Sequence, residues 1–367
     1  MENSLLHKIA LSIIPGIGGV LARNLVAYVG SVDAIFAEST KSLQKIPGIG
    51  EINAHRIKDK SLFQQAEKEI LFIEKNGIQP WFYTDKDYPR RLKNCTDAPI
   101  LIYTKGKMNL NSTYVLSIVG TRNATNYGKQ VCEELIQQIS ERNYNVLIVS
   151  GLAYGIDIQA HKAALKFGLP TVGVVAHGLD KLYPSLHTET ARKMTENGGL
   201  VSDFQSGTKI DPSNFIRRNR IVAGLADATL VVESAEKGGA LITAEIASSY
   251  NRDVFAFPGR AGDIYSKGCN QLIRNNGANL IEGIDDLEFF MGWEKTKNDG
   301  PVQTSLFTDL SADEELIVNL LRENGEMFVD QVSSVSRLPV SKVSSLLLSL
   351  EFKNVLISLP GKMYRLK

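Results

Sequence analysis

Residues 114–151 read YVLSIVGTRNATNYGKQVCEELIQQISERNYNVLIVSG, and this stretch decides the fold. Two short apolar runs, at 114–119 and 145–149, flank a longer amphipathic stretch at 126–142. Continuous apolar runs of this length are typical of strands that are buried on both faces of a parallel sheet. The stretch between them has the length and spacing of a helix, so the segment predicts a strand–helix–strand unit.

The same alternation continues toward the C-terminus of the chain. Further apolar runs lie at 171–176, 200–202, 229–233 and 254–257, and amphipathic stretches alternate with them at 155–167, 185–197, 213–226 and 239–250. The pattern predicts an α/β domain at 78–291, built on a Rossmann-like, doubly wound and mostly parallel sheet. In such a sheet the ligand lies outside the carboxyl ends of the strands, so the loops that follow the strands are the candidate site.

The first 60 residues contain an internal repeat. Pro15-Gly16-Ile17-Gly18 recurs as Pro47-Gly48-Ile49-Gly50, and the two copies keep register through the helix that follows each of them. Each copy predicts a helix, a tight glycine turn and a second helix. Residues 1–77 are therefore expected to form a helical, SAM-like domain with two helix-hairpin-helix motifs.

These glycine turns could contact a nucleic acid. A Gly-x-Gly turn at a helix start leaves backbone N–H groups free to face a phosphate, without reading any base. Arg23, His55 and Arg56 follow the turns and would add positive charge. We expect weak, sequence-independent DNA contact from residues 1–75, whose removal would lower affinity modestly and leave the central domain folded. The competing interpretation is a protein-interaction domain that uses glycine only for tight turns.

A polar segment at 292–308 predicts a linker before a small C-terminal module. The residues that follow, 309–367, contain three short helical patterns and then two alternating runs around Pro360-Gly361. Helices followed by a terminal hairpin predict a winged-helix-like module. A small helical packing domain without a function of its own is the alternative.

The overall composition excludes a chain that is basic everywhere. Lys and Arg number 41 and Asp and Glu number 40, so a site for a polyanion must concentrate positive charge locally. The three cysteines, Cys95, Cys132 and Cys269, are widely spaced, which argues against disulfides and a thiolate metal site. With no apolar run of membrane length and no signal-peptide core, we expect a cytoplasmic protein without membrane contact or bound metal.

Common catalytic and nucleotide-binding motifs are missing from the central sequence. Gln130 follows Gly128-Lys129 where a P-loop places Ser or Thr, and no Gly-x-Gly-x-x-Gly follows a strand. Ser150 ends a strand but lacks the preceding glycine of a nucleophile elbow. Asp157 and His161 are four residues apart, and we expect them to brace a loop rather than to act as an acid–base pair. The sequence therefore predicts no catalytic residue and no cofactor.

The strongest local concentration of positive charge is Phe215-Ile216-Arg217-Arg218-Asn219-Arg220, at the start of a predicted helix. Helical spacing prevents the three guanidiniums from facing one way, so we expect about two of them to reach a ligand. Phe215 would either stack on a base or belong to the core. Arg122, after the first strand, and Gly238-Gly239, which opens a helix, would complete a phosphate-binding crevice.

A set of motifs follows one another along residues 119–259. The motifs are Val119-Gly120-Thr121-Arg122, Ser150 to Asp157 with His161, Gly178-Leu179-Asp180 before Tyr183-Pro184, Arg218-Asn219-Arg220-Ile221, Leu241-Ile242-Thr243-Ala244 and Phe257-Pro258-Gly259. In this order they resemble the DprA (Smf) family of DNA-processing proteins. The resemblance implies a bacterial homodimer that binds single-stranded DNA and helps to load RecA onto incoming DNA during natural transformation. It implies no catalytic reaction, and it leaves weak binding of double-stranded DNA open.

Together, the residues and the resemblance predict one set of DNA-binding positions. The set is Gly120, Thr121, Arg122, Ser150, Gly151, Lys181, Phe215, Arg217, Arg218, Asn219, Arg220, Gly238 and Gly239. Three places depart from the family pattern: Gly238-Gly239 lacks the usual neighbouring serine, Asp203 stands where glutamate is common, and Ser185-Leu186-His187 replaces basic or amide residues. Because of the last departure, Lys181 is the candidate DNA contact of its loop.

Two other classes of function compete with DNA binding. Lys237-Gly238-Gly239 with Thr243 and Glu245 loosely resembles the glycine-threonine-glutamate signature of lysine-decarboxylase-like nucleotide hydrolases, although Leu241-Ile242 interrupts the spacing. Release of free base from nucleoside monophosphates would identify such an enzyme. A purely structural adaptor is the third interpretation, and it would show no salt-dependent binding of DNA.

Overall fold

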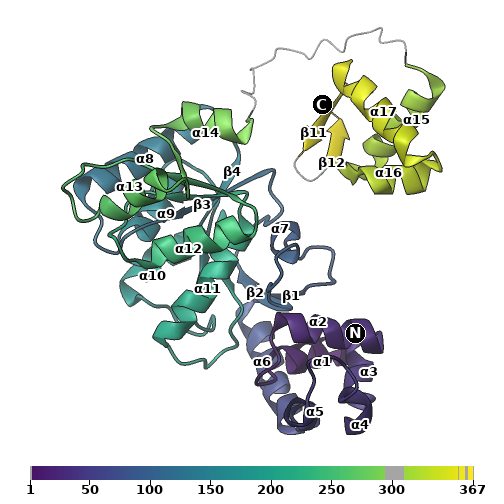
Figure 1. The fold of residues 1–367 in the computed structure, drawn as a ribbon. Helices are drawn as coiled ribbons and strands as arrows, with labels where there is room; N and C mark the ends of the chain where they lie inside the picture. Colours follow the sequence, from purple (N-terminus) through teal and green to yellow (C-terminus); the bar gives the residue numbers. More distant parts are fainter. Residues whose placement is uncertain (1, 294–309, 354, 360–362, 367) are drawn as a thin grey trace. The chain divides into compact units, whose positions relative to one another are not determined.

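The computed structural model describes residues 2–293, 310–353, 355–359 and 363–366 (Figure 1). The chain divides into two compact units, Met1–Thr296 and Lys297–Lys367. The first unit combines the N-terminal helices with a large sheet, and the second contains the C-terminal helices and a small sheet. Most of the linker predicted at 292–308 lies outside the described residues.

Within the described residues, nine strands form the large sheet in the order β1-β2-β6-β5-β4-β3-β7-β8-β9. Their bounds are β1 (Gln79–Phe82), β2 (Leu101–Lys105), β3 (Tyr114–Val119), β4 (Val146–Ser150), β5 (Thr171–Val174), β6 (Gly198–Ser202), β7 (Ala228–Val231), β8 (Asp253–Ala256) and β9 (Asn279–Leu280). Neighbours from β6 across to β9 are parallel, whereas β2 is antiparallel to both β1 and β6. The chain runs from β3 outward to β6 and then restarts beside β3 at β7. This reversal is the switch point of a doubly wound sheet, as the sequence predicts.

Helices cover both faces of the sheet because successive strand residues point to opposite sides. Leu116 and Ile118 of β3 share a core with α8 (Asn126–Glu141), α9 (Ile156–Lys166) and α14 (Ile284–Met291). Val115 and Val119 share the opposite core with α7 (Arg90–Lys93), α11 (Pro212–Leu225), α12 (Gly239–Ser249) and α13 (Lys267–Arg274). The short η1 (Ser185–His187) and α10 (Thr188–Met194) connect β5 to β6.

Six helices form the N-terminal domain: α1 (Glu2–Ser12), α2 (Gly19–Val29), α3 (Val32–Ala37), α4 (Thr40–Leu43), α5 (Glu51–Ile57) and α6 (Ser61–Asn76). Their core also contains apolar residues of the sheet and its approaches, namely Ile78, Phe82, Ile100, Leu101 and Tyr103. The boundary expected at residue 77 therefore separates two sets of elements that share one core.

The second unit has a core of its own, formed by residues such as Ile317, Leu321, Val332, Val343 and Leu347. Its elements are α15 (Ala312–Asn324), β10 (Met327–Phe328), α16 (Val329–Ser336), α17 (Val340–Phe352), β11 (Leu356–Leu359) and β12 (Met363–Leu366). The three strands are antiparallel in the order β10-β12-β11. This order of elements agrees with the winged-helix-like module predicted at 309–367, and that assignment stays a prediction.

Candidate functional site

The loops that follow β3, β4 and β7 meet at the carboxyl edge of the sheet. The amide of Thr121 donates to the carbonyl of Glu233 at 2.7 Å, and the amide of Ile156 donates to the carbonyl of Thr121 at 3.2 Å. The loop with Gly120-Thr121-Arg122 is thus held between the loops on either side of it. The structure places these loops where a doubly wound sheet binds its ligand.

Helix α11 begins at the same edge and carries the three clustered arginines. Asp211 caps it by accepting from the amide of Ser213 at 2.8 Å, and Pro212 occupies the first helical position. The arginine side chains then diverge. Arg217 is 58% exposed and Arg220 is 14% exposed, whereas Arg218 is buried.

Arg218 is an internal brace in this structure, whereas the sequence predicts that it faces a ligand, and its place in the DNA-binding set stays a prediction. Its guanidinium donates to the carbonyls of Gly151 and Val174, at the ends of β4 and β5. Burial lowers the pKa of Arg218 to about 10, and the nearby Asp157 carboxylate opposes that shift. A Cβ on Gly151 would lie 2.6 Å from both the Arg218 guanidinium and Asp157 Oδ2, so glycine is needed here for packing. The arginine therefore ties α11 to the sheet.

Ser150 and Gly151, which are also in the predicted DNA-binding set, lie inside the fold in the same way. Both residues are buried, and the Ser150 hydroxyl donates to the carbonyl of Ile118 at 2.6 Å. Neither residue offers an exposed side chain to a ligand in this structure. Small residues are present there because the strand ends pack closely against Arg218 and Asp157.

Arg220 is also held within the chain. It donates to Asp203 Oδ2 at 2.5 Å and to the carbonyl of Asp97. Its charge is therefore balanced by a carboxylate that is itself 1% exposed. About two of the three arginines were expected to reach a ligand, and in this structure only Arg217 of the three is exposed.

Exposed cations and aromatic rings gather beside the start of α11. The Arg122 guanidinium lies 5.6 Å over the ring of Phe215, and that ring lies 5.8 Å from the ring of Tyr183 in an edge-to-face arrangement. Arg122 is exposed and Tyr183 is 44% exposed. Lys181 is one-third exposed, with its Nζ 3.7 Å from Asp180 Oδ2. Sequence reasoning missed Tyr183 as a site residue, and its only signal was the Tyr183-Pro184 pair.

A neutral histidine holds the loop that carries Lys181 and Tyr183. His177 Nε2 accepts from the amide of Tyr183 at 3.1 Å, so Nδ1 carries the proton and donates to the carbonyl of Gly178 at 2.8 Å. Burial lowers the pKa of His177, which favours this neutral form. The two bonds fix the start and the end of the loop.

The Glu233 carboxylate occupies the N-terminus of α8, at the switch point of the sheet. Glu233 is 3% exposed, and its oxygens accept from the amide and the hydroxyl of Thr125 at 2.9 and 2.5 Å. A helix N-terminus at this point is where doubly wound proteins bind a nucleotide phosphate. In this chain its own carboxylate fills that position and holds the Arg122 loop in place.

The turn at Gly238-Gly239 remains open to solvent. Both glycines are exposed, and no side chain caps the start of α12 among the described residues. Asn219 donates to the carbonyl of Gly239 at 3.3 Å, which ties α11 to this turn. Thr243 bonds within its own helix, to the carbonyl of Gly239, and Glu245 is exposed.

Asp157 and His161 have separate partners, in agreement with a bracing role. Asp157 Oδ2 accepts from the amide of Ala153 at 3.4 Å, and burial raises the pKa of this carboxyl despite Arg218 nearby. His161 Nδ1 bonds the hydroxyl of Thr171 at 2.7 Å, and burial lowers the pKa of the histidine to about 3.

The two helical hairpins differ in what surrounds them. A Cβ on Gly19 would lie 2.1 Å from the carbonyl oxygen of Ala98, and Arg23 donates to the same carbonyl at 3.2 Å. The first turn therefore packs against the central domain. Arg56 of the second hairpin donates to the carbonyl of Pro15 in the first turn at 3.1 Å. A Cβ on Gly18 or on Gly50, the matching glycines of the two turns, would meet no atom within 4 Å.

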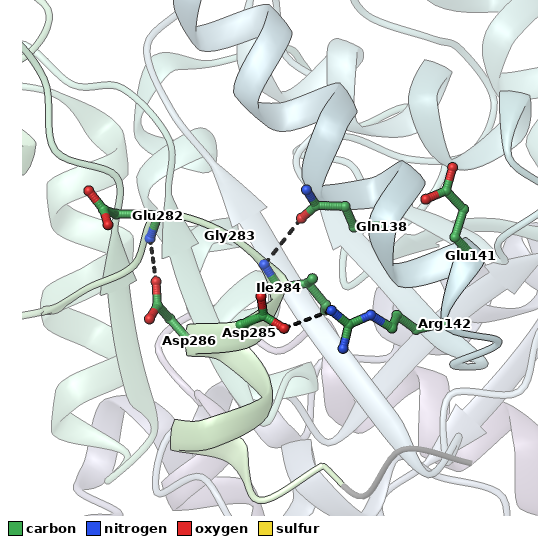
Figure 2. A pocket seen from close by; sticks show the side chains of 8 residues that line it. All are labelled: Gln138, Glu141, Arg142, Glu282, Gly283, Ile284, Asp285 and Asp286. Atoms are coloured by element: carbon green, nitrogen blue, oxygen red, sulfur yellow. Dashed lines mark hydrogen bonds and ion pairs between the residues drawn. The ribbon is translucent and has the colours of Figure 1, made fainter. Parts of the chain in front are cut away.

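A separate hollow of about 460 Å³ lies between the end of α8 and the start of α14 (Figure 2). Arg142 bonds Asp285 at 2.7 Å, and Gln138 accepts from the amide of Ile284 at 3.2 Å. Most of its charged lining residues are acidic, so it does not suit a polyanion. The hollow does not include the loops of the candidate site.

The described residues contain no cluster of potential ligands that could hold a metal ion. The three cysteines are buried free thiols. None of the helices in the described part of the chain combines the length and hydropathy that a membrane crossing requires.

Comparison with known proteins supports the resemblance seen in the motifs. The family model described as DNA recombination-mediator protein A matches residues 79–291, and a SAM-like helix-hairpin-helix tandem model matches 9–60. The DNA processing protein DprA of Bacillus subtilis is 37% identical over 65% of this chain and 80% of its own length. Protein Smf of Escherichia coli is 35% identical over 76% of this chain and 75% of its own length.

Two solved structures are also similar to this chain. The DprA structure from Streptococcus pneumoniae matches with a TM-score of 0.64 and 30% identity, over 77% of this chain and 96% of that one. The DprA structure from Helicobacter pylori, described for its single-stranded DNA binding mode, matches with a TM-score of 0.52 and 26% identity, over 58% of this chain and 94% of that one.

Proposed function

The chain belongs to the DNA recombination-mediator protein A family, and from that premise we propose that it binds single-stranded DNA without sequence preference. We propose further that the bound strand is passed to RecA, which the protein loads onto incoming DNA during natural transformation. A homodimer would hold two DNA segments at once and raise their effective concentration.

The observation that carries this proposal is the contact of Phe215 with Arg122 and Tyr183 at the carboxyl edge, with the exposed Arg217 on the same helix as Phe215. The exposed ring of Tyr183 and the partly buried ring of Phe215 offer stacking surfaces that every base can use, and guanidiniums bind the phosphates between bases. A surface of this kind fits unpaired nucleotides, because a duplex hides the faces of its bases. Neither interaction reads a particular base, so binding would be independent of sequence.

The position of Glu233 supports DNA binding over the nucleotide-hydrolase alternative. A bound nucleoside phosphate would have to displace a buried carboxylate from the N-terminus of α8, or sit beside its negative charge. Glu245, which that alternative needs in the site, is exposed on α12. We therefore assign no reaction and no cofactor to the chain.

Titration of labelled single- and double-stranded oligonucleotides at several salt concentrations tests the proposal. With Arg218 and Arg220 bound internally, Arg122, Arg217 and the one-third exposed Lys181 are the predicted site cations that a phosphate can reach. Three phosphate contacts predict a log–log salt slope of about −2 for single strands, at roughly −0.7 per phosphate. Duplex DNA should bind more weakly. Binding that ignores salt, or a preference for duplex, would count against the proposal.

A further inference from the structure

Asp203 is a buried carboxylate that contacts two arginines of α11. It follows β6 directly, and its side chain is 1% exposed. Its Oδ2 lies 2.5 Å from Arg220 Nη2 and 3.6 Å from Arg217 Nη2. Its Oδ1 has no hydrogen-bond partner within the described residues. The carboxylate therefore directs its interactions to one anchored arginine and to the exposed one.

Arg217 is held from two sides while part of its guanidinium stays in solvent. Its guanidinium carbon lies 5.0 Å over the ring of Phe204, which is 6% exposed, and Asp203 lies beside it. A free arginine side chain carries roughly 2 kcal/mol of rotamer entropy. Holding it in advance lowers the entropy that is lost when it binds a phosphate.

The N-terminal domain fixes the loop that carries Asp203 and Phe204. Glu69 of α6 is 4% exposed, and its carboxylate accepts from the amide of Ser206 at 3.0 Å and from the Ser206 hydroxyl. At the start of the loop, the amide of Phe204 donates to the hydroxyl of Ser202 at 3.0 Å. Both ends of the short segment 203–206 are therefore tied down.

We propose that Asp203 is a positioning residue of the DNA site, which anchors Arg220 and orients Arg217 toward a phosphate, with Glu69 securing its loop from the helical domain. The inference rests on the proposed function. It also predicts that DNA affinity falls when Asp203 loses its charge, which is the opposite of what simple electrostatics predicts. A negative charge beside a site for a polyanion weakens binding by Coulomb repulsion, so its removal should tighten binding unless the carboxylate is needed to place Arg217.

The direction of the change in DNA affinity is measured by titrating two full-length variants with a labelled oligothymidylate. The variants are Asp203→Asn and, as the control, Glu236→Gln. Glu236 is exposed in the loop after β7, so its variant also removes one negative charge near the same edge. We expect D203N to bind about five- to tenfold more weakly and to lose about 0.7 of the salt slope, as one phosphate contact would. The control should bind as tightly as the wild type or more tightly.

A double-mutant cycle shows whether Asp203 acts through Arg217. In an Arg217→Ala background, D203N should no longer weaken binding or lower the salt slope, because the oriented group is gone. Asp203→Glu keeps the charge and should recover most of the slope. If D203N does not fold, Glu69→Ala loosens the same loop from outside the site and should weaken binding in the same direction.

The outcomes separate this inference from the proposed function. D203N that binds like the control, with an unchanged slope, overturns the positioning role while the DNA site stands. The positioning role is also overturned if E69A, tested in place of an unfolded D203N, binds like the wild type. A wild-type protein that binds no oligothymidylate overturns the proposed function itself.

Discussion

The arginines of α11 show how a single residue's direction decides its role. Arg217, Arg218 and Arg220 lie within four positions, yet one is exposed, one is buried under the strand ends and one is paired with Asp203. The sequence predicts their helix and their charge. It does not predict which guanidinium turns inward, because that depends on carbonyls of β4 and β5 that are distant in the chain.

Replacing Arg122 with Ala should weaken single-stranded DNA binding and leave stability unchanged. Arg122 is exposed and touches the ring of Phe215, so its loss removes one phosphate contact and no core packing. We expect the salt slope to fall by about 0.7. Lys162→Ala, on an exposed position of α9, is the matched control and should bind like the wild type. Identical affinity for R122A would remove this loop from the site.

Replacing Arg218 with Ala should lower the stability of the protein and leave the salt slope of DNA binding unchanged. It removes donors to the carbonyls of Gly151 and Val174 and leaves the buried Asp157 without its nearby cation. The free energy of unfolding should fall by about 3 kcal/mol, as measured by urea denaturation. Where the variant remains folded, its salt slope should match the wild type. A flattened slope with normal stability would return Arg218 to the DNA-contact set.

Buried histidines should make the fold sensitive to acid. The pKa of His161 is lowered to about 3, so below about pH 6.5 the unfolded chain takes up a proton that the folded chain refuses. The contribution of the neutral His161 to the free energy of unfolding is therefore fully present above about pH 6.5 and declines as the pH falls. His161→Asn keeps a donor for Thr171 and removes the titration. When the pH is lowered from 7.5 to 5.5, the free energy of unfolding of this variant should fall by about 1 kcal/mol less than that of the wild type. Equal losses would contradict the assignment.

At the scale of elements, the alternating pattern predicted the sheet better than it predicted the loops. The strands β3 to β8 and the helices α8, α9, α11 and α12 follow from apolar runs and periodicity, which are local signals. The strands β1, β2 and β9 were not predicted from the sequence. The conformation of the loop with Tyr183 depends on His177 and on buried backbone groups. Periodicity and composition do not reveal hydrogen bonds between residues of this kind. The contact between the rings of Tyr183 and Phe215 therefore becomes apparent only in the structure.

The helical domain was expected to be dispensable for folding, and the shared core argues against that expectation. Deleting residues 1–75 would expose Phe82, Ile100, Leu101 and Tyr103, which are now buried. Each such side chain contributes about 1.5–3 kcal/mol when fully buried. We expect the truncated chain to lose its cooperative urea transition or to aggregate. A truncated chain with a wild-type unfolding midpoint would show that the sheet domain folds alone.

At the scale of the whole molecule, the described residues include the side chains that we propose to bind a single DNA strand. Stacking rings and exposed cations lie at the carboxyl edge, while the carboxylate at the switch point fills the position of a nucleotide phosphate. Under the proposed function, such a protein acts by changing what else can bind the strand. The family to which the chain belongs suggests the same kind of output, mediation of recombination.

The most direct test of this account is the rate of RecA filament formation on single strands already coated with single-strand-binding protein. The wild-type protein should speed nucleation, and a variant carrying both Arg122→Ala and Arg217→Ala should lose this effect together with most of its DNA affinity. A rate that is the same with and without the wild-type protein, while that protein binds single-stranded DNA normally, would contradict the account.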